Sequence, residues 1–101
     1  MKNGYNILWT DHALNELKNT IEFLEKNWTD KELKKLAMKL EGILLLISQN
    51  PYLFPASDVN KEIRRVVILS FNTLYYRIYK HEVQIISFFS NRQSPKKRKL
   101  L

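Results

Sequence analysis

The spacing of the apolar residues changes once along this chain, and the change separates a helical part from a β part. In residues 11–49, apolar side chains recur every three or four positions, as they do on one face of an α-helix. In residues 63–89, short runs of branched and aromatic residues are typical of β-strands. This order predicts an α+β domain whose helices pack on one face of a sheet.

The first predicted helix follows a short predicted strand, Tyr5–Trp9. Thr10 is placed to cap this helix, and Asp11 is favourable at its positive N-terminal end. Apolar residues then recur at the period of an amphipathic helix. This stripe contains Ala13, Leu17, Ile21, Leu24 and Trp28.

The second predicted helix follows almost without a linker, so the two helices are expected to form an antiparallel hairpin. Thr29 and Glu32 have the spacing of a capping box, and Asn50 is disfavoured in a helix because Pro51 follows it. Gly42 lies in mid-helix, where we expect it to allow close packing against the first helix. The apolar stripe contains Leu33, Leu36, Ala37, Leu40, Leu44 and Ile47.

Three further strands are predicted after a loop at residues 51–61: Ile63–Leu69, Thr73–Tyr79 and Val83–Phe89. The short segments between them favour an antiparallel meander. The predicted architecture is therefore β-α-α-β-β-β, an antiparallel sheet with a two-helix hairpin on one face. We expect one domain at residues 1–91, followed by a basic C-terminal tail at residues 92–101.

Alternation along the strands assigns each side chain to one face of the sheet. The more apolar set is expected to cover the helices and contains Ile63, Val67, Leu74, Tyr76 and Ile78. The other set is expected on an open face and contains Arg64, Thr73, Tyr75 and Arg77. Basic and aromatic residues on a solvated face suit contact with a nucleic acid or an acidic peptide.

Charge is distributed unevenly along the chain. Residues 1–60 contain 7 basic and 8 acidic side chains, whereas residues 61–101 contain 10 basic and 2 acidic ones. This excess favours a polyanion or an acidic protein segment as partner, and a plain solvated surface is the alternative. The chain lacks cysteine, an apolar run long enough to span a membrane and a signal peptide, so we expect a soluble cytoplasmic domain.

Few residues are suited to acid–base or metal chemistry. His12 and His81 are expected at the surface, and only Glu62 and Glu82 supply carboxylates in the β part. We therefore expect no metal site, no cofactor and no metal-dependent nuclease. What remains is clamping or cleavage of a phosphodiester by guanidinium groups, for which the candidates are Arg64, Arg77 and Arg92.

Several short motifs occur in a fixed order along the chain: residues 9–13 (Trp-Thr-Asp-His-Ala), 50–51 with 54–55 (Asn-Pro, Phe-Pro), 63–65 (Ile-Arg-Arg), 74–78 (Leu-Tyr-Tyr-Arg-Ile) and 88–95. Together they resemble the RelE/ParE superfamily of toxins from bacterial type II toxin–antitoxin pairs. The resemblance implies a compact α+β toxin with a concave sheet face. It also implies a cognate antitoxin protein that wraps around the toxin, and contact with DNA only through the antitoxin complex.

The superfamily has two activities. RelE-like members cut mRNA on the ribosome without metal, using basic residues on three strands and a C-terminal aromatic residue or histidine. Arg64 and Arg92 match basic positions of that set, but Val66 and Thr73 stand where further basic residues are expected, and residues 96–101 lack the aromatic ending. ParE-like members poison DNA gyrase without that set. The resemblance therefore favours a ParE-like toxin that binds its target or antitoxin through Arg64, Tyr75, Arg77 and Arg92.

Three alternatives stay open on the sequence alone. The chain could be a RelE-like, ribosome-dependent mRNA endonuclease. It could be a nucleic-acid-binding module without toxicity, since exposed tyrosines beside arginines suit base stacking. It could also be a toxin that keeps its antitoxin contact and has lost its activity.

Overall fold

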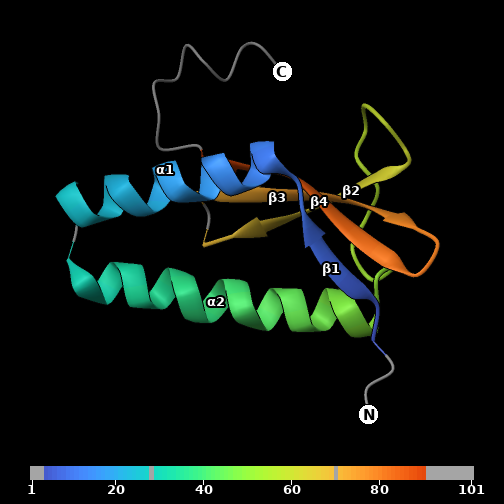
Figure 1. Cartoon of the computed structure of the whole chain (residues 1–101), viewed down its shortest axis with the longest axis horizontal. Helices are drawn as coiled ribbons and strands as arrows, with labels where there is room; N and C mark the ends of the chain where they lie inside the picture. Colours follow the sequence, from blue (N-terminus) through green and yellow to red (C-terminus); the bar gives the residue numbers. More distant parts are fainter. Residues whose placement is uncertain (1–3, 28, 70, 91–101) are drawn as a thin grey trace.

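The computed structural model describes residues 4–27, 29–69 and 71–90, and shows a four-stranded sheet with two long helices (Figure 1). The elements are β1 (Asn6–Trp9), α1 (Asp11–Asn27), α2 (Asp30–Gln49), β2 (Ile63–Ile68), β3 (Asn72–Tyr79) and β4 (Glu82–Ser90). The predicted α+β order is confirmed. Trp28 and the predicted tail, with Arg92, lie outside the described residues, so the division of the chain near residue 91 stays a prediction. No helix in the described ranges is long and apolar enough to cross a membrane.

The sheet has the strand order β1-β4-β3-β2. Strands β2, β3 and β4 form the predicted antiparallel meander. The first strand pairs with the last one in parallel, from Asn6 opposite Glu82 to Trp9 opposite Ile85, which makes the sheet mixed. A parallel pair needs a long crossover, and here the helical hairpin and the rest of the meander provide it.

The faces of β2 are the reverse of the prediction. Val66 and Ile68 are 9% and 0% exposed, whereas Val67 is 50% exposed. Val66 lies opposite Leu74, and directly opposite residues share a face of the sheet. The set with Val66 therefore faces the helices.

This reversal moves Arg64 to the helix side, and moves Ile63 and Val67 to the open face. The physical reason is that both sets of β2 combine an arginine with branched apolar residues, so hydropathy alone did not distinguish them. The face of β3 was predicted correctly, because Leu74 and Tyr76 are fully buried. The open face accordingly carries Ile63, Arg65, Val67, Thr73, Tyr75 and Arg77.

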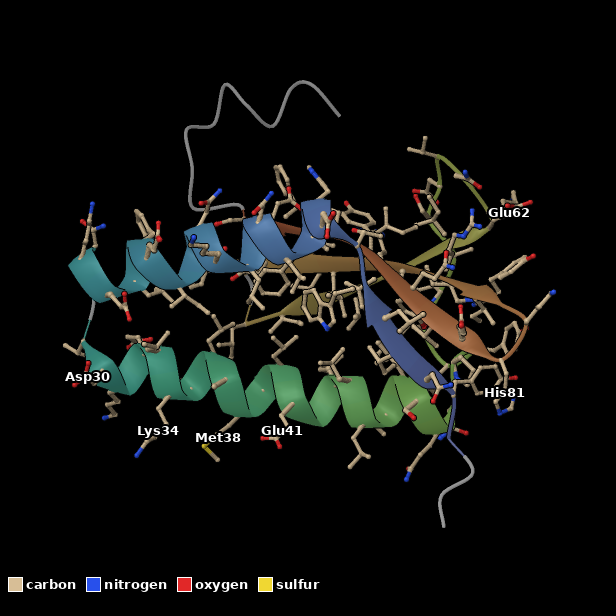
Figure 2. All side chains as sticks on the ribbon, viewed as in Figure 1. Asp30, Lys34, Met38, Glu41, Glu62 and His81 are labelled. Carbon is tan, nitrogen blue, oxygen red and sulfur yellow. The ribbon has the colours of Figure 1, made fainter. Side chains whose placement is uncertain are left out.

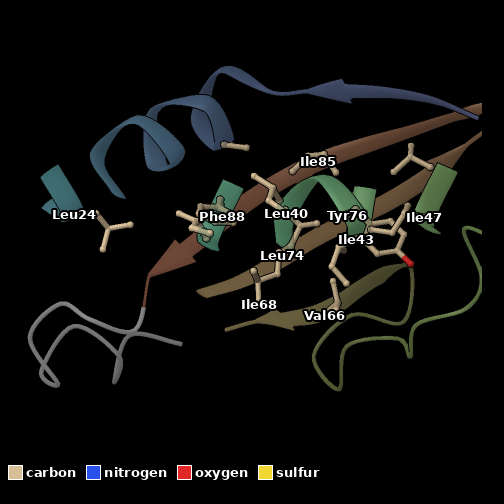
Figure 3. Close-up of a cluster of buried hydrophobic side chains, with 13 residues drawn as sticks. Leu24, Leu40, Ile43, Ile47, Val66, Ile68, Leu74, Tyr76, Ile85 and Phe88 are labelled. Carbon is tan, nitrogen blue, oxygen red and sulfur yellow. The ribbon is translucent and has the colours of Figure 1, made fainter. Parts of the chain in front are cut away.

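The hydrophobic core lies between the helices and the sheet (Figure 3). Its helical members include Leu24, Leu36, Leu40, Ile43 and Ile47, and its sheet members include Val66, Ile68, Leu74, Tyr76, Val83, Ile85 and Phe88. Two expectations for α2 are wrong. Ala37 is exposed while Ile43 is buried, and a Cβ atom at Gly42 would meet nothing within 4 Å, so this glycine serves no close helix packing.

The ends of the helices follow the sequence in part. The hydroxyl oxygen of Thr10 accepts a hydrogen bond from the Ala13 N–H at 3.1 Å, as expected for an N-cap. Thr29 occupies the N-cap position of α2, but its side chain makes no capping hydrogen bond, so the capping box is not formed. The C-cap is Asn50, directly before Pro51, as predicted.

One carboxylate ties α1 to the sheet. Oε1 of Glu16 accepts hydrogen bonds from the Ser87 hydroxyl at 2.6 Å and from the Phe88 N–H at 2.8 Å. His12 Nε2 lies 3.4 Å from the same oxygen. The hydrogen bonds from Ser87 and Phe88 to Glu16 hold α1 over β4.

Candidate functional site

Two of the predicted site residues line one pocket at the end of the sheet where β2 begins and β3 finishes. Ile63 lies opposite Arg77, so Arg64 and Arg77 come from adjacent positions on neighbouring strands. The pocket has a volume of about 380 Å³. Its lining consists of Tyr52, Lys61, Glu62, Arg64, Arg77, Ile78 and Tyr79. We call it the Arg64–Arg77 pocket.

Arg64 is held in place by the loop that follows α2. Its Nη1 donates a hydrogen bond to the Phe54 carbonyl at 2.6 Å, and its guanidinium lies 5.0 Å from the centre of the Tyr52 ring. The backbone of Arg64 also forms a β-bridge with Ala56. A partly buried guanidinium with these contacts has little rotamer freedom left, so it is a preorganised cation.

Arg77 lies on the other side of the sheet end and is exposed. Its Nε donates a hydrogen bond to Gln84 Oε1 at 2.9 Å. Its guanidinium lies 5.9 Å from the centre of the Tyr79 ring, and Lys80 Nζ lies 5.4 Å from the same centre. Tyr79 is thus contacted by two cations at the rim of the pocket.

Tyr76 lies next to Arg64 in the fold, and its ring is fully buried in the core. Its hydroxyl donates a hydrogen bond to the Pro51 carbonyl at 2.7 Å. Burial raises the pKa of Tyr76 above its ordinary value of 10.0, although the positive charge of Arg64 acts in the opposite direction. The hydroxyl therefore keeps its proton at neutral pH and is unsuited to act as a base.

The remaining predicted site residues do not line this pocket. Tyr75 lies on the open face opposite Arg65, with its side chain partly buried. Arg92 lies outside the described residues. The described chain stops at Ser90, which is opposite Asn72 at the far end of β3 from Arg77.

Neither histidine lines the pocket. The ring of His81 stacks on Tyr5 with 4.5 Å between ring centres, and His12 contacts Glu16. Figure 2 shows Glu62 and His81 at one end of the molecule, with Asp30 at the other. Within the described ranges, no group of three or more acidic, histidine or cysteine side chains could hold a metal ion. The pocket is lined chiefly by cations and aromatic rings, with Glu62 as its carboxylate.

A second hollow lies between the two helices. It has a volume of about 250 Å³, and is lined by Leu17, Ile21, Leu33, Leu36, Ala37, Leu40, Glu41 and Leu44. We call it the helical groove. On α2, Lys34 and Met38 point away from the core (Figure 2). The stripes of both helices were interpreted as core, and most of the groove-lining stripe residues do belong to the core or pack against it. Ile21 and Ala37 line the groove without being part of that cluster.

Sequence reasoning missed Tyr52 in the Arg64–Arg77 pocket. Tyr52 belongs to a loop without periodicity, so nothing in the sequence placed it beside Arg64. Tyr79 was expected among the exposed tyrosines that suit base stacking, but nothing in the sequence placed it in one pocket with Arg64. The sequence does indicate that both tyrosines are exposed, since they occur in segments rich in basic or turn residues and belong to no apolar stripe.

Comparison with known proteins was informative at the level of structure. No protein-family model and no curated protein matches this sequence. Among solved structures, a chain described as the chromosomal ParDE TA system from P. aeruginosa superposes with a TM-score of 0.70. The two sequences are 13% identical over 85% of this chain and 95% of that one. This similarity shows the fold, which is RelE/ParE-like, as the sequence resemblance indicated.

Proposed function

We propose that this chain, which has a RelE/ParE-like fold, is the toxin of a type II toxin–antitoxin pair and arrests growth in the ParE-like manner, by acting on DNA gyrase. The observation that carries the proposal is the shared fold with a chain of a ParDE system, over nearly the whole of that chain. Cytoplasmic localisation follows from the proposed target.

The environment of two strand residues favours the gyrase poison over the mRNA endonuclease. Val66 and Thr73 occupy positions where the RelE-like set would place basic residues, and here they are 9% and 6% exposed. Neither side chain carries a positive charge for a phosphate, and both are buried. The buried hydroxyl of Tyr76, with its raised pKa, supplies no base either.

An antitoxin would find two kinds of surface on this molecule. The helical groove is apolar and open, which suits the apolar face of an amphipathic segment. Arg64, Tyr75 and Arg77 belong to strands β2 and β3, where the two guanidinium groups suit anionic groups of a target or an antitoxin. We infer that the antitoxin covers the groove, and that contacts with target or antitoxin are made by these three residues together with Arg92.

The test is induction of the chain in bacteria, with and without the product of the neighbouring reading frame. We expect growth arrest that the neighbour relieves, with broken DNA and intact mRNA. Purified gyrase incubated with the chain should lose supercoiling activity. Arrest with ribosome-dependent mRNA cleavage and undisturbed gyrase would instead establish the RelE-like alternative, and the absence of any arrest would refute a toxin.

A further inference from the structure

The Arg64–Arg77 pocket combines fixed cations with exposed aromatic rings. Tyr52 is 63% exposed and Tyr79 is 48% exposed, although each ring is in contact with an arginine. Large exposed tyrosines are not explained by core packing, because neither belongs to the hydrophobic cluster. Rings held against guanidinium groups are suited to stacking with a planar ligand.

The charge of the pocket selects an anion. Three of its lining residues are basic, Lys61, Arg64 and Arg77, and one is acidic, Glu62. In the described part of the chain, neither guanidinium is paired with a carboxylate. Arg64 donates one N–H to the Phe54 carbonyl, and Arg77 donates one N–H to Gln84. Neither guanidinium makes another hydrogen bond within the described residues. The remaining N–H groups form the fork that binds phosphate in a bidentate manner.

The size of the pocket suits one small ligand unit. A volume of about 380 Å³ lies within the range of small-molecule sites. We propose that this pocket binds one nucleoside phosphate, with the phosphate at Arg64, Arg77 and Lys61 and the base stacked on Tyr52. The ligand is either a free nucleotide or a single nucleotide of a strand, since both present the same chemistry.

An acidic peptide fits the same observations less well. A single carboxylate carries one negative charge, and it would leave both tyrosine rings without a stacking partner. A nucleoside phosphate provides an anion for the cations and a base for the Tyr52 ring at once. The proposal goes beyond the proposed toxin function, because binding is a property of the purified chain and is measured without cells or gyrase.

The experiment is calorimetric titration of the full chain with ADP, adenosine, inorganic phosphate and a deoxyadenosine hexanucleotide. We expect ADP or the hexanucleotide to bind, and adenosine and phosphate to bind more weakly. Arg77→Gln should weaken binding about tenfold or more, because it removes a charged donor. The matched control is Arg65→Gln, another exposed strand arginine on the same face but outside the pocket, which should change affinity less than about twofold.

A second pair of variants tests the stacking. Tyr52→Leu should weaken binding by about fivefold or more, whereas Tyr52→Phe should keep it, because only the ring face is used. Arg64 is not substituted, since its bond to Phe54 also holds the loop. Thermal melts verify that each variant is folded.

The outcomes separate the sources and can overturn the proposal. Tighter binding of the hexanucleotide than of ADP identifies a strand, and equal or weaker binding identifies a free nucleotide. Equal losses in Arg65→Gln and Arg77→Gln would show unspecific charge attraction. Failure of both ADP and the hexanucleotide to bind, or displacement of ADP by a hexaglutamate peptide at equal affinity, would refute the site. The growth-arrest experiment does not depend on the outcome of these titrations, so the nucleotide site and the toxin function can each be refuted without the other.

Discussion

A single oxygen of Glu16 joins α1 to β4, and its loss has a predictable cost at the residue scale. Glu16→Ala removes the acceptor of the Ser87 hydroxyl and of the Phe88 N–H. Hydrogen bonds to a charged group contribute about 1.5–3 kcal/mol, and the Phe88 N–H would lose its partner. We expect the free energy of unfolding to fall by about 2 kcal/mol in urea titrations.

The control for this change is Glu22→Ala, an exposed glutamate on the same helix. It should alter the free energy of unfolding by less than about 0.5 kcal/mol. Equal midpoints for the two variants would show that the carboxylate of Glu16 does not hold the helix to the sheet.

The buried hydroxyl of Tyr76 links stability to alkaline pH. Its pKa in the folded protein is raised above 10.0 by burial, so the folded state holds this proton more tightly than the unfolded state does. Stability from this group is fully present below pH 10 and is lost as the pH rises through the folded pKa. We expect the wild type to lose more stability than Tyr76→Phe between neutral pH and pH values above 10, in melts of both proteins.

Tyr76→Phe also serves as a probe at neutral pH. It leaves the Pro51 carbonyl without the Tyr76 hydroxyl, which should cost about 1–2 kcal/mol. If the stabilities of the two proteins fell equally with rising pH, the alkaline loss of stability could not be assigned to Tyr76.

At the scale of elements, the helices and strands that have a strong local pattern were predicted correctly from the sequence. The extents of α1 and α2 follow from apolar periodicity, and Pro51 marks the end of α2. The face of β2 was wrong because both of its faces carry an arginine and branched residues, so only pairing with Leu74 decides between them. The parallel pairing of β1 depends on contacts between residues 76 positions apart in sequence, such as Asn6 and Glu82, for which no local pattern exists.

The same limit applies to the candidate site. Arg64 and Arg77 were identified from their positions in strands, but Tyr52 enters the pocket through a loop whose path is set by tertiary contacts, such as the bond from Arg64 to Phe54. Alternation in β2 alone could not show that Arg64 lies on the helix side. The chemistry of the site was thus visible in the sequence, while its geometry was not.

Helix α2 uses two faces, and paired substitutions distinguish them. Leu40 is 9% exposed in the core, whereas Leu45 is 60% exposed. Leu40→Ala should lower the free energy of unfolding by about 2–5 kcal/mol, because it leaves a cavity. Leu45→Ala should change it by less than about 0.5 kcal/mol in the same urea titration. A larger loss for Leu45→Ala would place the buried face on the wrong side of the helix.

At the scale of the whole molecule, the helical groove and the Arg64–Arg77 pocket are built from different elements. The groove belongs to α1 and α2, and the pocket to the loop after α2 and the adjoining ends of β2 and β3. The two surfaces share no lining residue. Neutralisation by a partner in the groove and action on a target through the arginines should therefore be separable by mutation.

The corresponding prediction is a double dissociation. Ala37→Glu places a charge in the apolar groove, so it should weaken co-purification with the antitoxin and leave growth arrest intact. Met38→Glu is the control, since Met38 is 67% exposed and does not line the groove. Arg77→Ala should abolish arrest and still retain the antitoxin, because the groove that binds the antitoxin is unchanged. Thermal melting should be nearly unchanged, because exposed arginines contribute less than about 0.5 kcal/mol. If Arg77→Ala and Ala37→Glu impaired both properties equally, target and antitoxin would have to share one surface, and the separation argued from the two linings would be wrong.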